Sequence, residues 1–292
     1  MLKTVQIENY RSIQHLELDL GRVNCFVGHS SKSHILEALG VLGAAASGWV
    51  DDCSLQYRGV HLPPEEKHRE VFLRAETDRV HYEVTLGSSE TDWRYQDEAL
   101  WDRGGEVLSR AKGGKNLDAI RGFVSLGLVN MDPSSPTSKL LRGLQQFSVY
   151  NLLTPVLRGT MADPQLRHPL GLYGGGLDLP VYGTSDEALH ISALTQLLTA
   201  KDGPSVFGVE NLGATFSPAL SRTLDDACLG SARQILFTTE NPSVLDGIGV
   251  SQDDVRLFLV SQDAEQKIVV RRVMPDSSQS QPLSVLWMQG LL

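Results

Sequence analysis

Lys32 and Ser33 are the residues of this sequence whose types and position most directly indicate phosphate chemistry. They follow the apolar segment 23–27 and Gly28, and they precede an apolar stretch that begins at Ile35. An apolar strand, a glycine, a polar turn, Lys-Ser and an apolar helix form the layout of a phosphate-binding loop. In such a loop the lysine contacts the β- and γ-phosphates and the serine hydroxyl binds Mg²⁺.

The spacing of this turn departs from the pattern GxxxxGK[ST], in which glycines with positive φ let backbone N–H groups point at a phosphate. The second glycine of the pattern falls on Ser31, the first falls on Phe26, and Gly28 lies too close to Lys32. Two interpretations stay open: weakened binding of ATP or a simple anion, or an ordinary strand-to-helix turn. In the first, the binding residues are Gly28, Ser31, Lys32 and Ser33, with Ser33 also directed at Mg²⁺.

A second chemical position follows the apolar segment 205–209. Glu210 and Asn211 stand where phosphate-binding enzymes place a carboxylate toward Mg²⁺ and a second carboxylate that activates water. Glu210 can reach Mg²⁺ through a water. The amide of Asn211 cannot accept a proton, so it cannot act as a general base. A strand that ends in Glu-Asn at a turn is the structural alternative.

Two further turns carry polar residues that would face the same site. Glu240 follows the apolar segment 234–238, where ATPases with this layout often place a polar group toward the γ-phosphate. Its negative charge suits hydrolysis poorly, and a turn fixed by the following Asn-Pro pair is the alternative. Ser185 and Asp186 precede a helical apolar stripe, 187–198. Either residue can be the N-cap of this helix, and contact of Ser185 with nucleotide is the other interpretation.

Hydrophobic periodicity predicts the elements that position these residues. Segments with alternating or continuous apolar residues predict strands at 2–9, 15–20, 23–27, 71–75, 80–86, 93–100, 205–209, 234–238, 255–260 and 267–273. Apolar residues at helical spacing predict helices at 33–45, 139–146, 187–198 and 218–224. We therefore predict an α/β fold with a mixed sheet, an antiparallel β-rich flank and helices.

Composition narrows the class of protein further. With 41% hydrophobic residues, the 292-residue chain can bury a large core. No apolar run reaches the length of a transmembrane helix, so we expect a cytoplasmic protein without a membrane partner. The cysteines lack CxxC spacing and predict reduced thiols rather than a zinc site or a disulfide framework. They are Cys25, Cys53 and Cys228.

The net charge of −9 argues against a surface built to bind DNA. A local basic face is compatible with this charge, and one group of basic residues would be its source. We interpret that group as a solvated loop instead. Its members are Arg110, Lys112, Lys115 and Arg121.

Taken in order, these segments resemble the ABC-type ATPase heads shared by SMC, RecF-type and OLD-family proteins, and most of all the small bacterial AAA-labelled ATPases of that group. The opening MLKTVQIENYRSIQHLELDLGRVNCFVG resembles their N-terminus, and HILEALGVLGAA resembles the helix after the Walker A loop. YGTSDEALHISALTQLL resembles the signature segment, VFGVENLGATFSPAL the Walker B and D-loop stretch, and QILFTTENPSVLDGI the switch strand. The resemblance implies a P-loop NTPase fold of the ABC-type head, in a single head over 1–292. Residues from about 105 to 165 would form an inserted or variable lobe, and 275–292 a flexible tail.

Several positions depart from the family pattern together. The resemblance implies that Glu210 replaces the Walker B Asp, Asn211 the catalytic Glu, and Glu240 the switch His. Glu187 stands at the signature Gly. The cofactors that the family implies are ATP and Mg²⁺, and these departures put both in doubt. They predict a head that keeps the fold and has lost turnover.

The leading hypothesis is a catalytically degenerate head that serves as a scaffold or regulatory subunit of a multi-protein bacterial complex. It would form homo- or hetero-oligomers through the head face with a partner ATPase or an effector, and the family resemblance suggests anti-phage defence. One alternative is an ATP-gated dimerising ATPase with slow hydrolysis. Another is a RecF-like DNA-binding repair protein, which salt-dependent DNA binding would support.

Overall fold

The computed structural model divides the chain into two compact units. The first unit comprises Met1–Leu20, His34–Ser148 and Gln262–Val269, and the second comprises Gly21–Ser33, Val149–Ser261 and Val270–Leu292. The structure describes residues 1–28, 30–61, 70–88, 93–111, 118–127, 130–178, 184–214, 216–217, 222–223, 227–247, 253–274 and 281–291. Lys112, Lys115 and most of the helix predicted at 218–224 lie outside these residues.

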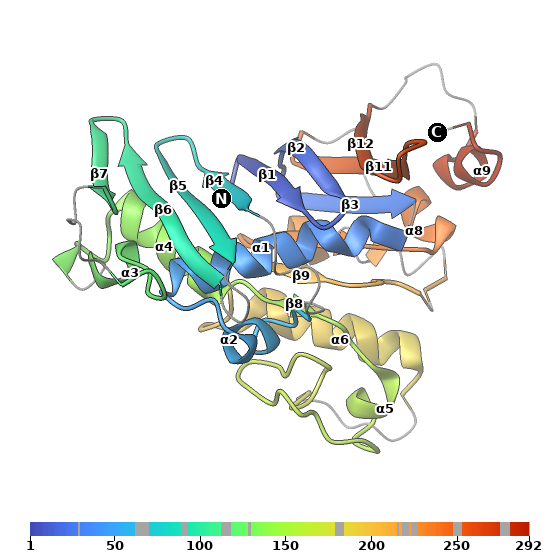
Figure 1. Ribbon diagram of the computed structural model, residues 1–292. Helices are drawn as coiled ribbons and strands as arrows, with labels where there is room; N and C mark the ends of the chain where they lie inside the picture. Colours follow the sequence, from blue (N-terminus) through green and yellow to red (C-terminus); the bar gives the residue numbers. More distant parts are fainter. Residues whose placement is uncertain are drawn as a thin grey trace. The chain divides into compact units, whose positions relative to one another are not determined.

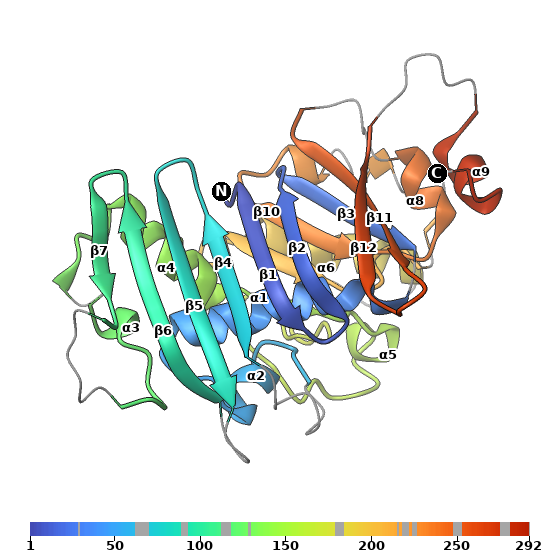
Figure 2. The same cartoon turned by 45° about the horizontal axis from the view of Figure 1, so that its top comes forward.

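The first unit is built on a six-stranded antiparallel sheet with the order β2-β1-β4-β5-β6-β7 (Figures 1 and 2). Its strands are β1 (Thr4–Tyr10), β2 (Ile13–Asp19), β4 (Val71–Glu76), β5 (Val80–Ser88), β6 (Trp93–Asp102) and β7 (Gly105–Ser109). Alternation places apolar residues on one face and polar residues on the other, as the sequence predicts for a sheet with one face covered.

Helices cover the apolar face of this sheet (Figure 2). They are α1 (Ser33–Ala46), of which all but the first residue belongs to this unit, α3 (Val124–Gly127) and α4 (Pro136–Gln146); a short α2 (Asp52–Gln56) follows α1. The Tyr95 hydroxyl donates to the carbonyl oxygen of Ala45 at 3.0 Å, which ties β6 to the end of α1. Arg110, interpreted from the sequence as part of a solvated loop, is buried and donates to the carbonyl oxygen of Arg121 at 3.0 Å. That interpretation is wrong for Arg110, because its guanidinium holds backbone carbonyls inside the unit.

The second unit contains a six-stranded sheet with the order β12-β11-β3-β10-β9-β8. Its strands are β3 (Val23–Gly28), β8 (Val149–Tyr150), β9 (Val206–Val209), β10 (Gln234–Thr238), β11 (Val255–Gln262) and β12 (Ile268–Val273). The last residue of β11 and the first two of β12 belong to the first unit. The five strands from β11 to β8 run parallel. Their almost continuous apolar sequences fit a parallel sheet that is covered on both faces.

Helix α6 (Asp186–Thr199) buries its apolar stripe against the parallel strands. Leu194 and Leu197 belong to the same core cluster as Phe207 and Phe237, so helix and sheet share one hydrophobic core. The remaining helices of this unit are α5 (Thr154–Leu157), α8 (Pro242–Gly247) and α9 (Leu283–Met288). Helix α9 lies within the range predicted as a flexible tail, and Asp246 of α8 accepts hydrogen bonds from the amide and hydroxyl of its Ser284.

The predicted α/β class, with a mixed sheet and an antiparallel β-rich flank, is confirmed by these two sheets. Cys25 and Cys228 are buried free cysteines, and Cys53 is an exposed one. Within the described residues, every helix falls short of the length and hydropathy needed to cross a membrane.

Candidate functional site

Three neighbouring parallel strands end at one edge of the second unit's sheet, and each leads into a turn with residues predicted to do chemistry. β10 lies between β3 and β9, with Thr238 opposite Phe26 and Phe237 opposite Val209. Because the carboxyl ends of parallel strands meet at one edge, the turns that begin at Gly28, Glu210 and Thr239 lie side by side. All four predicted positions lie in this unit, and three of them lie at this edge of its sheet.

The turn after β3 begins at Gly28, which has φ of +110°. This residue lies opposite Val260 in the parallel pairing of β3 with β11. A Cβ atom at Gly28 would come within 2.2 Å of the carbonyl oxygen of Val260, so both the backbone angle and the close approach require glycine. The absence of a side chain at Gly28 therefore allows β3 to pack closely against β11.

Lys32 ends a single 3₁₀ turn, Ser30–Lys32, and α1 begins at the next residue, Ser33. The lysine side chain is 5% exposed, and its Nζ lies 3.0 Å from Oε1 of Glu240. Glu240, by contrast, is 68% exposed. Lysine from the first predicted position and glutamate from the third thus form an ion pair, with the charge of the buried lysine balanced by a carboxylate of the same chain.

Asn211 adopts a left-handed backbone conformation, with φ of +48°. Its amide nitrogen donates to the Thr238 hydroxyl at 2.9 Å, and the Leu212 amide donates to the Thr238 carbonyl at 2.8 Å. The Glu210 amide donates to the carbonyl of Tyr150 on the neighbouring strand at 2.8 Å. Backbone hydrogen bonds to two neighbouring strands thus fix the turn after β9.

Asn241 ties the turn after β10 to the turn after β9. Its Nδ2 donates to the carbonyl oxygens of Gly213 at 2.7 Å and Phe216 at 2.8 Å. Its Oδ1 accepts from the Ser243 amide at 3.0 Å, at the start of α8. The sequence predicts Asn241 only as part of a turn, because a side chain that binds carbonyls 25 and 28 positions away leaves no local pattern.

Ser185 is the N-cap of α6, and its hydroxyl accepts a hydrogen bond from the Ala188 amide at 3.3 Å. Arg233, just before β10, donates to the carbonyls of Leu197 and Ala200, so α6 ends near the beginning of β10. A helix of 14 residues is about 21 Å long. Ser185 therefore lies toward the same edge of the sheet as the three turns. Its hydrogen bond with the Ala188 amide is the bond that an N-cap residue forms.

The described residues do not fit a nucleoside triphosphate held as in a phosphate-binding loop. Lys32 is buried and already paired with a carboxylate, and Ser31 belongs to a tight 3₁₀ turn rather than to an open arch of N–H groups. The side-chain amide of Asn211, which the sequence pattern assigns to the position of the general base, cannot accept a proton. Among the described residues, His, Cys, Asp and Glu form no group of three or more that could hold a metal ion.

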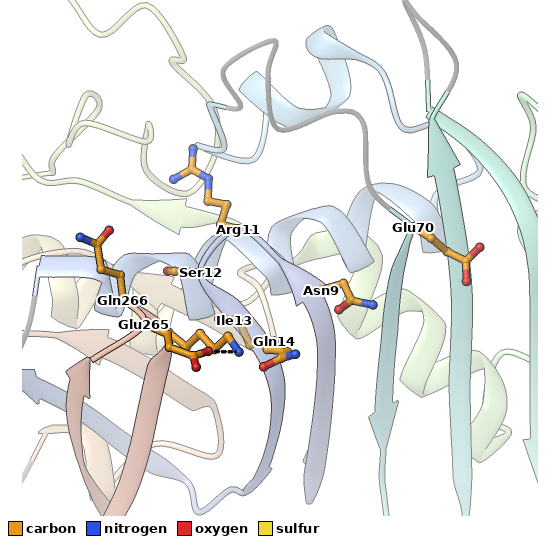
Figure 3. Close-up of a pocket in the computed structure, with 9 residues that line it drawn as sticks. Asn9, Arg11, Ser12, Ile13, Gln14, Glu70, Glu265 and Gln266 are labelled. Carbon is orange, nitrogen blue, oxygen red and sulfur yellow. Dashed lines mark ion pairs between the residues drawn. The ribbon is translucent and has the colours of Figure 1, made fainter. Parts of the chain in front are cut away.

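A groove of about 570 Å³ lies in the first unit, formed by the β1–β2 turn and the turn at 265–267 (Figure 3). Mixed polar side chains line it, among them Arg11, Gln14 and Lys267. Arg11 is held by Glu37 at 2.7 Å, and Lys267 is paired with Glu265 at 2.6 Å. None of the predicted chemical residues lines this groove.

His34 lies with its Nδ1 2.8 Å from the Ser12 hydroxyl. Ser12 lies in the turn between β1 and β2, so His34 joins the beginning of α1 to that turn within the first unit. The separation of 22 residues between the two side chains hides the contact from local sequence patterns.

Comparison with protein-family models finds no match, and neither does comparison with curated proteins. Among solved structures the chain is similar to the SMC head domain from Thermotoga maritima, with 13% identity, a TM-score of 0.48 and coverage of 94% of this chain and 99% of that one. An Smc head bound to the C-terminal winged-helix domain of ScpA has 13% identity and a TM-score of 0.49, with coverage of 95% and 98%. The recombination mediator protein RecF has 10% identity and a TM-score of 0.43, with coverage of 92% and 98%.

Proposed function

We propose that this chain is a catalytically degenerate ABC/SMC-type ATPase head that acts as a scaffold or regulatory subunit in a multi-protein bacterial complex. Its partner would be an ATPase or an effector protein. Under this proposal the chain acts by binding its partner through its surface, and not by hydrolysing nucleotide. A role in anti-phage defence follows from the family resemblance in the sequence.

The observation that carries the proposal is the ion pair between Lys32 and Glu240. A lysine that binds phosphate must present its ammonium group to an incoming anion. Here the ammonium group is buried, and the carboxylate of Glu240 already lies 3.0 Å away. A bound phosphate would have to displace this carboxylate or accept its repulsion, and either lowers the affinity.

Asn211 supports loss of hydrolysis independently of binding. Its side-chain amide is not a base at neutral pH, and the turn that holds it is bonded through its backbone to Thr238. Glu210 is the acidic residue that precedes it, and the Glu210 amide is bonded to Tyr150. The pair thus lacks the second carboxylate needed to activate water.

The exposure of Glu240 favours a second candidate, the ATP-gated dimerising ATPase with slow hydrolysis. A carboxylate that is 68% exposed can turn into solvent at modest cost, which would release Lys32 at the beginning of α1. In that case Mg-ATP would bind weakly and would promote dimerisation. The two candidates differ in what wild-type protein does with nucleotide.

Calorimetric titration of the purified chain with Mg-ATP separates the two. The experiment compares wild type with Lys32→Ala, and uses the exposed Lys201→Ala as a control of equal charge change. The degenerate head predicts no binding heat at high micromolar ATP in any of the three proteins. Binding by wild type and by Lys201→Ala that is lost in Lys32→Ala would overturn it in favour of the ATP-gated dimer.

A further inference from the structure

The antiparallel sheet of the first unit has one face that, among the residues the structure describes, no helix of that unit covers (Figure 2). Most of its side chains are half-buried or exposed, with Ala99 and Ser109 as buried exceptions, in contrast to the buried residues that alternate with them. The strand register groups these side chains into rows that cross the sheet. One row runs Glu17, Gln6, Arg74 and Glu83, and the next runs Asp19, Thr4, Glu76, His81 and Trp101. We call this surface the open face.

Carboxylates dominate the charge of the open face. Its described residues include two guanidinium groups, Arg74 and Arg94, and seven carboxylates. The carboxylates are Glu8, Glu17, Asp19, Glu76, Glu83, Asp97 and Glu106. Because they stand on all six strands, the negative potential covers the whole face and not one corner.

Arg74 shows how this surface holds a guanidinium group. Its Nη2 lies 2.7 Å from the Glu76 carboxylate, and its Nη1 lies 3.9 Å from the carboxylate of Glu83 on the neighbouring strand. Carboxylates that project from adjacent strands are thus spaced so that one planar cation contacts two of them. Guanidinium–carboxylate contacts of this kind carry geometric specificity as well as charge.

Aromatic rings lie among the carboxylates. Trp101 and His81 stack with their ring centroids 5.8 Å apart, and the Trp101 Nε1 donates to the Glu83 carboxylate at 3.2 Å. Phe72 lies on the same face, opposite Glu8. Fixed aromatic rings beside carboxylates favour arginine and lysine side chains, through cation–π attraction and contact with their aliphatic stems.

The charge of the open face selects the class of occupant. The phosphates of nucleic acid and of anionic lipid would meet carboxylates and be repelled. A second copy of this chain would bring the same acidic surface from a molecule of net charge −9. A polypeptide rich in arginine and lysine is the partner whose charge is complementary.

The size of the open face selects the form of that partner. Six strands about 4.8 Å apart, each about 23 Å long, span a flat outline of about 550 Å². An extended segment of about seven residues is about 23 Å long, so it fits along this outline. We propose that the open face binds a short, arginine- and lysine-rich segment of a partner protein. This inference goes beyond the proposed function and does not depend on the state of the nucleotide site.

The test measures the affinity of a fluorescein-labelled peptide of alternating arginine and serine with one central lysine, by fluorescence anisotropy. The open-face variant is Glu8→Lys with Glu17→Lys. The control is Asp202→Lys with Asp253→Lys, which makes the same charge change at exposed positions of the second unit. We expect the open-face variant to weaken binding about tenfold and the control about twofold or less.

Two further measurements locate the peptide. A carbodiimide joins carboxylates to the peptide lysine, and mass spectrometry should find the cross-links on the seven carboxylates of the open face. Labelled duplex DNA and phosphatidylserine vesicles, each added to the protein without the peptide, should not bind it. Equal weakening in both variants, cross-links mainly elsewhere, or binding of DNA or vesicles by the wild-type protein would each overturn the proposal. Thermal unfolding of both variants shows that they remain folded.

Discussion

The ammonium group of Lys32 and the carboxylate of Glu240 lie 3.0 Å apart, although 208 positions separate the two residues in the sequence. The lysine is buried and the glutamate is exposed. The two partners are therefore unequal: loss of the glutamate leaves a buried charge without its carboxylate, whereas loss of the lysine leaves an exposed carboxylate in water.

A double-mutant cycle should show this inequality. We expect Glu240→Gln to lower the free energy of unfolding by about 1–2 kcal/mol in the wild-type chain, and by less than about 0.5 kcal/mol when Lys32→Met is also present. Urea denaturation of the four proteins gives both values. An equal effect of Glu240→Gln in the two backgrounds would mean that the ion pair contributes nothing to stability.

Gly28 provides a second test. Its positive φ and the close approach of the Val260 carbonyl each require glycine, and a second glycine allows their costs to be separated. Gly28 and Gly105 have similar φ angles, +110° and +122°, but a Cβ at Gly105 has no neighbouring atom within 4 Å. Gly105→Ala should therefore cost only backbone strain, about 1–3 kcal/mol. Gly28→Ala should cost more, since its Cβ would collide with the Val260 carbonyl oxygen. Comparable urea midpoints for the two variants would refute the clash.

Most elements of the fold could be predicted from the sequence because their apolar patterns are local. The continuous apolar runs that became β3 and β10, and the helical stripe of α6, each contain the information within one segment. The elements without such a pattern were missed. Strand β8 has two residues, and α2 has five and depends on a capping box at Asp51.

The candidate site could be predicted only in part, since its contacts join distant segments. The sequence identified Lys32 and Glu240 separately, as a lysine at a helix start and an acidic residue after a strand. Their pairing required the parallel register of β3 with β10. Gly28 is similar: the sequence suggests a role in phosphate binding, whereas the structure relates its conformation to Val260, which lies in a strand near the other end of the chain.

Asn241 should control local opening of the turn after β9. Asn241→Ala removes two hydrogen bonds to the carbonyls of Gly213 and Phe216, and the turn should then open more often. We expect hydrogen exchange at the amides of Asn211 and Leu212 to become about tenfold faster or more. The amide of Ile235, which donates to the carbonyl oxygen of Arg22 just before β3, is the internal control. Unchanged exchange at 211 and 212 would show that Thr238 alone fixes this turn.

Glu98 should make the free energy of unfolding depend on pH, and the substitution Glu98→Gln should remove this dependence. It is fully buried in β6, where its carboxylate accepts hydrogen bonds from the Tyr82 hydroxyl at 2.8 Å and the Phe123 amide at 2.5 Å. Burial raises the pKa of Glu98, and these hydrogen bonds oppose that rise without cancelling it. The folded chain therefore holds the Glu98 proton at pH values where the unfolded chain has released it.

The direction of the effect follows from this difference in bound protons. The contribution of Glu98 to stability is fully present below the unfolded pKa, about 4.3, and is lost as pH rises through the raised folded pKa. Glu98→Gln keeps an oxygen that accepts from the Phe123 amide but cannot titrate. The free energy of unfolding of wild type minus that of Glu98→Gln should fall as pH rises above 4.3, by at most about 1.4 kcal/mol per pH unit. Urea denaturation across this range measures the difference, with the exposed Glu17→Gln as control. A difference that stays constant or increases with pH would show that the pKa of Glu98 is not raised in the folded chain.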